Sequence, residues 1–281
     1  MTSTIISCEF FPPRTEKGVE NLRETRKQLQ VLQPAYFSVT FGAGGSTQEK
    51  TLETVLDIQQ SGADAAPHLS CIGSTRENIL NLLQDYQAHG IRRIVALRGD
   101  KPSGWLGGDV GELSYANELV EFIRSETGSH FHIEVAAYPE FHPQAHSAKE
   151  DLDYFKQKVE AGANSAITQY FYNADAYFRL LDSCAKRGIE IPIVPGIMPI
   201  ANFEQLVRFS DTCGAEVPRW LRWRLKDFGD DKKSLQAFGV EVLTNLCERL
   251  LAGGAPGLHF YTLNQSGLIL EIAKGLGLIK K

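Results

Sequence analysis

The charged triplet Arg98-Gly99-Asp100 is the first group of residues in this chain whose types could do chemistry. It directly follows residues 94–97, a short run of β-forming residues typical of a strand covered on both faces. Arg98 would hold a rigid positive fork at the strand end, Gly99 permits a close backbone approach, and Asp100 adds a carboxylate. A salt-bridged turn is the alternative interpretation.

A second acid, Glu9, stands at the end of another strand-like run. Two acids on different strands could divide the work, with Glu9 transferring a proton and Asp100 stabilising positive charge. The apolar residues 10–13 beside Glu9 predict that its pKa is raised. The alternative is that Glu9 is a solvated carboxylate with no chemical role.

Strands and helices alternate along the chain and must position these acids. Eight strand-like runs are present, at residues 4–10, 35–40, 65–71, 94–97, 131–138, 165–172, 192–197 and 258–263. Helical patterns between them indicate parallel pairing, and eight such units in about 250 residues are typical of a (β/α)8 barrel. Residues 198–257 are too many for one helix, so extra helices are expected there. We expect a single domain over residues 1–281.

The competing architecture is a doubly wound open sheet. Such a sheet would bind a dinucleotide through G-x-G-x-x-G, and neither that spacing nor the P-loop pattern occurs. Their absence favours the barrel. Two helix starts follow from capping patterns, Ser46 with Glu49 and Ser74 with Glu77.

Composition excludes several classes of protein. The 281 residues are 43% hydrophobic, but no apolar run reaches 18 residues, so no membrane span is expected. The N-terminus leads directly into a strand and lacks the features of a signal peptide. Five scattered cysteines without C-x-x-C indicate reduced thiols and a cytoplasmic protein. The net charge of −5 argues against a nucleic-acid partner.

Other candidate motifs are weaker. His142 and His146 have the i, i+4 spacing of a helical metal pair, but Pro143 interrupts it and no carboxylate ligand follows, so no metal is expected. Residues 42–45 could cradle a phosphate or form a plain turn. The glycines around Trp105 could form a lid over the site or a surface excursion.

Segments distributed over essentially the whole chain, in the same order, resemble methylenetetrahydrofolate reductase. They are residues 7–14, 37–43, 66–69, 94–100, 136–140, 166–169 and 260–264. The resemblance is to the short bacterial form, a catalytic barrel without the regulatory domain of the eukaryotic enzyme. It implies FAD at the carboxyl face and hydride transfer from NADH or NADPH to FAD, and then to 5,10-methylenetetrahydrofolate. It also implies a 5-methyltetrahydrofolate product for methionine synthesis, ping-pong kinetics and a homo-oligomer.

The resemblance also assigns residues. It implies that Glu9 is the general acid, and that Asp100 stabilises the folate cation and tunes the flavin. FAD would contact Thr40, His68, Arg98, Gly99, Asp100, Ala116, Tyr138, His142, Ala145, Asp151, Tyr154, Gln157 and Lys158. The folate would contact Thr40, Asp100, Gln169, Gln205, Phe209 and Gln265. Core packing is the alternative role for Phe209. Gln265 stands where some members have an arginine, which leaves recognition of the glutamate tail open.

Two other functions remain as alternatives. One is a barrel lyase or transferase that binds a pterin without a flavin, and the other is a non-enzymatic flavin-binding or assembly protein. The choice between NADH and NADPH also stays open, because no residue that reads the ribose can be placed.

Overall fold

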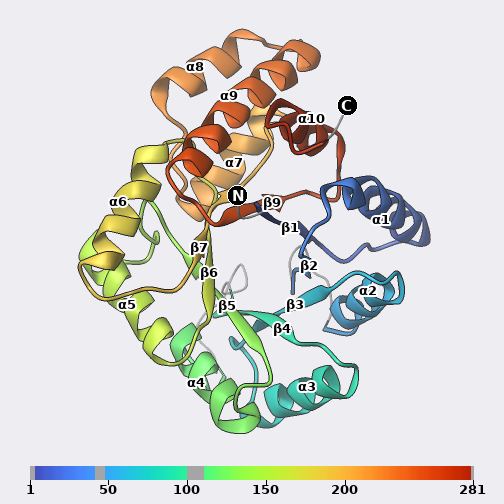
Figure 1. Ribbon diagram of the computed structural model, residues 1–281, viewed down its shortest axis with the longest axis vertical. Coiled ribbons are helices and arrows are strands. Elements are labelled where there is room, and N and C mark those ends of the chain that lie inside the picture. The colour runs from blue at the N-terminus through green and yellow to red at the C-terminus, as the bar shows by residue number, and fades with distance from the viewer. Residues whose placement is uncertain (1–3, 42–47, 100–110, 280–281) are drawn as a thin grey trace.

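The strands form one parallel sheet that curls into a barrel, with the helices outside it (Figure 1). The computed structural model describes residues 4–41, 48–99 and 111–279. The strands are β1 Ile5–Phe10, β2 Tyr36–Val39, β3 Ala65–Ser70, β4 Arg93–Leu97, β5 His132–Ala137, β6 Ser165–Thr168, β7 Ile193–Val194, β8 Gly196–Ile197 and β9 Gly257–Tyr261. They are hydrogen-bonded in the order β7-β6-β5-β4-β3-β2-β1-β9-β8, which confirms the predicted (β/α)8 fold.

The predicted strand at residues 192–197 is interrupted at Pro195, and its two pieces occupy the two ends of the sheet order. Before the proline, β7 pairs with β6, and after it, β8 pairs with β9. Proline has no N–H to donate to a ladder, although its carbonyl still accepts from His259 N at 3.0 Å. One interrupted strand therefore closes the barrel.

Helices surround the barrel and follow the strands as predicted (Figure 1). They are α1 Glu16–Leu29, η1 Gln30–Leu32, α2 Gln48–Gln60, α3 Arg76–Ala88, α4 Ala116–Thr127, α5 Ala148–Glu160, α6 Ala174–Ala185, α7 Phe203–Cys213, α8 Arg219–Asp227, α9 Lys232–Ala252 and α10 Gly267–Gly275. The extra helices expected between the last two strand runs are α7, α8 and α9. Over the described ranges, no helix combines the length and the apolar character needed to cross a membrane.

Successive side chains of a strand point to opposite faces, so the apolar side chains lie outside the barrel and the polar ones inside it. On β1, Cys8 and Phe10 are buried against the helices, and the Phe10 ring stacks on Phe37 of β2 at 5.2 Å. Ser7 and Glu9 point the other way, into the barrel, because successive side chains of a strand face opposite sides. The apolar packing therefore lies outside the strands, and the chemistry lies within them.

One predicted helix cap is wrong by one residue. Thr75, not Ser74, caps α3, since its side chain accepts a hydrogen bond from Asn78 N at 3.2 Å. The backbone of Ser74 serves the preceding turn instead, donating to Cys71 O and accepting from Glu112 N. The other predicted cap, Ser46, lies outside the described residues.

Candidate active site

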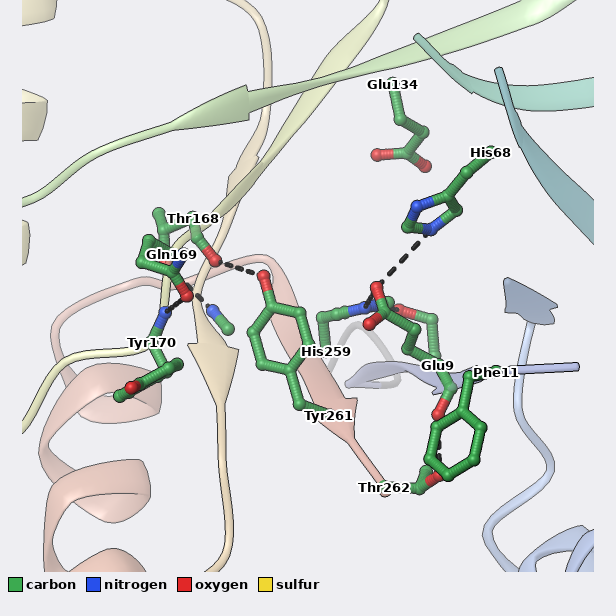
Figure 2. A network of polar contacts seen from close by, with 12 residues as sticks. Glu9, Phe11, His68, Glu134, Thr168, Gln169, Tyr170, His259, Tyr261 and Thr262 are labelled. Carbon is green, nitrogen blue, oxygen red and sulfur yellow. Dashed lines mark hydrogen bonds and ion pairs between the residues drawn. The ribbon is translucent and has the colours of Figure 1, made fainter. Parts of the chain in front are cut away.

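Glu9 lies at the carboxyl end of β1, between two histidines that come from different strands (Figure 2). Its Oε2 is 3.3 Å from His68 Nε2 on β3 and 3.7 Å from His259 Nε2 on β9. Both Nε2 atoms are buried, and neither has another partner within the described ranges. The parallel sheet explains this meeting, because the carboxyl ends of its strands converge on one mouth of the barrel.

The structure reverses the predicted direction of the Glu9 pKa. Burial alone would raise it, but hydrogen bonding to His259 and His68 and their charges outweigh burial and lower the pKa of Glu9 to about 2. The Phe10 ring does not cause this burial, because it points outward to Phe37, and Phe11 is 40% exposed. At neutral pH Glu9 is therefore a carboxylate whose proton must come from a partner.

The segment after β9 holds the Glu9 backbone in place. Thr262 donates its hydroxyl hydrogen to the Glu9 carbonyl at 2.5 Å. Two residues on, Asn264 accepts from Phe11 N at 3.0 Å and donates to Phe11 O at 2.9 Å. Leu263 and Asn264 adopt left-handed φ values of 50° and 57°, which turn the chain back toward β1. Sequence reasoning gave neither Thr262 nor Asn264 a role.

His259 is another residue that sequence reasoning missed. It is fully buried, and its Nδ1 lies 2.8 Å from Ser7 Oγ. The sequence did contain a signal for it. Side chains alternate between the two faces of a strand, and a histidine within an apolar, buried strand needs a polar partner on its own face. Tyr261, two residues further, faces the same interior and donates to Thr168 O at 2.8 Å (Figure 2). This contact links β9 to β6 beside Gln169.

The charged end of β4 is organised by neighbouring loops. Arg98 Nη1 donates to Gln144 Oε1 at 2.7 Å, which ties this end to the loop before α5. Gly99 has a φ of 88°, and a Cβ there would lie 2.0 Å from Ser70 Oγ. The close approach predicted at Gly99 is therefore an approach to Ser70 on β3. Asp100 lies outside the described residues.

The predicted FAD residues occupy one side of the mouth, from β2 to α5. Thr40 follows β2, His68 lies on β3, Arg98 and Gly99 follow β4, and Ala116 begins α4. The remainder belong to the segment that runs from the end of β5 through α5, namely Tyr138, His142, Ala145, Asp151, Tyr154, Gln157 and Lys158. Tyr138 and His142 meet edge to face at 4.7 Å. The structure thus brings this set into one sector.

Lys158 and Thr40 show that this sector fits a polar, anionic cofactor. The Lys158 ammonium donates to Ala136 O at 2.5 Å, and burial lowers its pKa to about 8, opposed by the Asp151 charge. Burial also raises the pKa of Asp151. The Thr40 hydroxyl oxygen is buried and has no hydrogen-bond partner in the described part of the chain. A partly buried cation and an unsatisfied hydroxyl are groups that a phosphate-bearing ligand would stabilise.

The predicted folate residues occupy the opposite side, apart from Thr40 and Asp100. Gln169 follows β6, and its Oε1 accepts from Tyr170 N at 3.0 Å. Gln205 and Phe209 lie on α7, one turn apart, and Gln265 is exposed after β9. Phe209 is half-buried against the core and has the Arg208 guanidinium 5.5 Å from its ring centroid. Glu9 therefore stands between the two sectors.

Some predicted features cannot be placed. Residues 42–45 and Trp105 lie outside the described ranges, as does any lid they would form. Among the described residues, no cluster of three or more histidine, cysteine or acidic side chains could hold a metal ion. His142 Nδ1 instead accepts from Gln144 N at 3.0 Å.

Comparison with known proteins gives a consistent result. A family model described as methylenetetrahydrofolate reductase matches residues 1–277. The 5,10-methylenetetrahydrofolate reductase of Pectobacterium carotovorum is 41% identical over 273 residues, covering 97% of this chain and 90% of the relative. The Escherichia coli K12 protein of the same name is 38% identical with the same coverage. Arabidopsis thaliana methylenetetrahydrofolate reductase (NADH) 1 is 39% identical over 98% of this chain, which spans 49% of the plant protein.

A solved structure supports the fold independently of close sequence similarity. A Clostridium thermocellum protein, described as binding two copies of 5-methyl-5,6,7,8-tetrahydrofolic acid, superposes with a TM-score of 0.67 at 17% identity. The match covers 99% of this chain and 94% of that one. At this identity it is evidence for the shared barrel.

Proposed function

The chain belongs to the methylenetetrahydrofolate reductase family, an oxidoreductase family, and on this premise we propose that it reduces 5,10-methylenetetrahydrofolate to 5-methyltetrahydrofolate with NADH or NADPH through bound FAD. The observation that carries the proposal is Glu9 held between His68 and His259 at the carboxyl mouth. One side of that mouth offers cationic and hydroxyl groups to a cofactor, and the other offers amides and an aromatic ring to a pterin.

FAD, when bound, supplies hydride chemistry that no side chain of the protein can perform. The protein would hold it through the β2-to-α5 sector, where Lys158 and Arg98 offset phosphate charge and Thr40 gains the partner that its hydroxyl lacks. We assign Asp100 the role of stabilising positive charge on the folate, on the strength of the family resemblance alone.

Glu9 would deliver the proton that opens the folate imidazolidine ring. Its carboxylate carries almost no proton of its own at neutral pH, so a proton must reach Glu9 from a neighbouring group before it passes to the substrate. Gln169 and Gln205 would orient the pterin, because amides match its paired donors and acceptors. The protein thus separates proton supply from hydride supply.

We further propose ping-pong kinetics, with the nicotinamide and the folate using one pocket in turn. Phe209 supports this, since a half-buried ring can stack on either heterocycle. The 5-methyltetrahydrofolate product is a methyl donor, which would place the reaction before methionine synthesis. The plant relative carries NADH in its name, which favours NADH as the first reductant to assay.

The experiment that tests the proposal follows flavin colour. Purified protein, with FAD added, should absorb near about 450 nm, the usual band of bound flavin. Without oxygen, NADH or NADPH should bleach it, and 5,10-methylenetetrahydrofolate should restore the colour. A protein that binds no FAD but binds the folate would support the flavin-free lyase or transferase. Bleaching by neither nucleotide, or no recovery with the folate, would contradict the reductase.

A further inference from the structure

Buried polar side chains continue below Glu9 through the interior of the barrel. The interiors of such barrels are commonly filled by branched apolar residues, yet here the interior contains serine, tyrosine, histidine and glutamate. We call the following set the polar line: Glu9, His259, Ser7, Tyr36, Glu134 and His132. It extends from the carboxyl mouth toward the opposite, amino-terminal mouth, since His132 is the first residue of β5.

The upper half of the polar line joins Glu9 to Tyr36. His259 Nε2 lies 3.7 Å from Glu9 Oε2, and the other ring nitrogen, Nδ1, lies 2.8 Å from Ser7 Oγ. Ser7 and Tyr36 are register partners on β1 and β2, so their side chains lie side by side on the interior face of the sheet. His259 is thus placed with one nitrogen toward the acid and the other toward a hydroxyl, which is the arrangement that a proton shuttle needs.

The lower half joins Tyr36 to the amino-terminal mouth. The Tyr36 hydroxyl donates to Glu134 Oε1 at 2.9 Å. That oxygen lies 3.8 Å from His132 Nε2, close enough for an ion pair, while the hydrogen bond of His132 Nε2 is to Ser165 Oγ at 2.6 Å. Arg93 pairs with the same Glu134 oxygen and stacks over the Tyr36 ring at 4.4 Å. Glu134 is 2% exposed, whereas the His132 side chain is 37% exposed. The lower end of the line therefore reaches solvent.

We propose that the polar line is a proton path that carries protons from solvent at the amino-terminal mouth to Glu9. The inference rests on the proposed function, in which Glu9 gives up one proton for each folate reduced. The Glu9 side chain is 18% exposed at the carboxyl mouth, and bound substrate would cover that mouth. A path through the interior stays open while the site is occupied.

The proton balance along the path is simple. One proton enters at His132 from water, each intermediate member accepts one proton and releases one, and Glu9 receives one and passes it to the substrate. No bond between heavy atoms changes, and no electron moves along the path. Burial and the nearby Glu134 charge raise the pKa of Tyr36, so its phenol stays protonated and can relay by exchanging one hydrogen for another.

A purely structural role is the competing explanation for these contacts. Buried polar groups that only hold the fold together are generally fully hydrogen-bonded. Here Glu134 Oε2 is buried and has no hydrogen-bond partner over the described ranges. A carboxylate oxygen that is free to accept a hydrogen bond suits a group that takes up and releases a proton. A structural role and a proton-relay role also predict different outcomes for a conservative variant.

Tyr36→Phe is the decisive variant, because it removes the relay hydroxyl and keeps the ring on which Arg93 stacks. In stopped-flow experiments we expect folate-driven reoxidation to slow by about 100-fold, the lower end of what proton transfer contributes to catalysis. Bleaching by NADH should stay within about twofold, since that half-reaction takes no proton from Glu9. Tyr86→Phe is the matched control, because Tyr86 is equally buried but lies on α3, outside the barrel interior.

A second measurement judges the path without turnover. In the purified protein with histidine labelled by 15N, exchange of the His259 ring proton with solvent should be about tenfold slower in Tyr36→Phe than in Tyr86→Phe. If Tyr36→Phe does not fold, His132→Ala should slow the same exchange, and added imidazole should restore it. Unchanged exchange and unchanged folate reoxidation would overturn the path. Failure of the wild-type protein to reduce the folate would instead overturn the proposed function, while the exchange measurement would still test the path.

Discussion

The ring of Tyr261 fills the space that a side chain at Gly196 would need. A Cβ on Gly196 would lie 2.5 Å from Tyr261 Cε2 and 2.2 Å from the Thr168 carbonyl oxygen. These contacts join β8, β9 and β6 at the closure of the barrel, next to the mouth that holds Glu9. The absence of a side chain at Gly196 therefore leaves room for the Tyr261 ring beside the carboxyl mouth.

We expect Gly196→Ala to lower the free energy of unfolding by about 1–3 kcal/mol, because neither the ring nor the backbone oxygen can move freely. Gly267→Ala is the matched control, since a Cβ there meets no atom within 4 Å and Gly267 begins a helix. Urea unfolding of both variants measures the difference. Equal stabilities would show that the closure of the barrel tolerates the added methyl group.

We expect Glu9→Gln to leave NADH-driven flavin reduction within about twofold of wild type and to slow folate reduction by about 10²–10⁴-fold. The amide keeps the shape of the side chain but cannot pass a proton on. Glu53→Gln, at an exposed position of α2, is the control for loss of one carboxylate. Equal losses in both half-reactions would exclude a specific role as the acid.

The low pKa of Glu9 predicts how stability depends on pH. Folding lowers this pKa from its ordinary value of 4.5 to about 2, so the folded protein binds fewer protons than the unfolded chain between these values. The resulting stability is present above about pH 4.5 and is lost as pH falls toward 2, by up to roughly 3 kcal/mol. Urea unfolding between pH 6 and 3 should show the wild type losing stability faster than Glu9→Gln. Parallel curves would contradict the pairing with His68 and His259.

The pKa of Lys158, lowered by burial to about 8, predicts a pH dependence of FAD binding. As pH rises through about 8 the ammonium loses its proton, so the Kd for FAD should rise. Lys158→Met should weaken FAD binding at pH 7 by about tenfold, the effect of one lost charge-assisted hydrogen bond, and should flatten the pH profile. Fluorescence titration measures both. Lys156→Met, on the same helix and with its side chain 42% exposed, should behave like wild type. An unchanged profile in Lys158→Met would remove Lys158 from the cofactor site.

Phe209 tests whether one pocket serves both substrates. Phe209→Ala should raise the KM for NADH and for the folate by a similar factor of about 10, the cost of a lost aromatic contact. Phe209→Leu, which keeps apolar bulk, should preserve stability but not stacking. Lost stability with intact affinity for both substrates would assign the ring to the core, against which it packs.

Sequence alone predicted the eight strand runs, the parallel barrel, the extra helices before the last strand and the family. These are local or repeated properties. A strand buried on both faces needs a continuous run of apolar residues, and a helix needs apolar residues at a helical period. Each element can therefore be predicted from the residues within it. The strand ends could likewise be predicted as the site, because parallel strands place their carboxyl ends together.

Tertiary structure decided how the site residues behave. Phe10 precedes Phe11 and follows Glu9, yet alternation sends its ring outward to Phe37, so the predicted apolar wall does not control the acid. His68 and His259 are remote from Glu9 in sequence and reach it only when the sheet closes. A pKa responds to the charges and solvent within a few ångströms of the group. Which groups those are is a property of the closed barrel, and no neighbouring residue in the sequence could supply it.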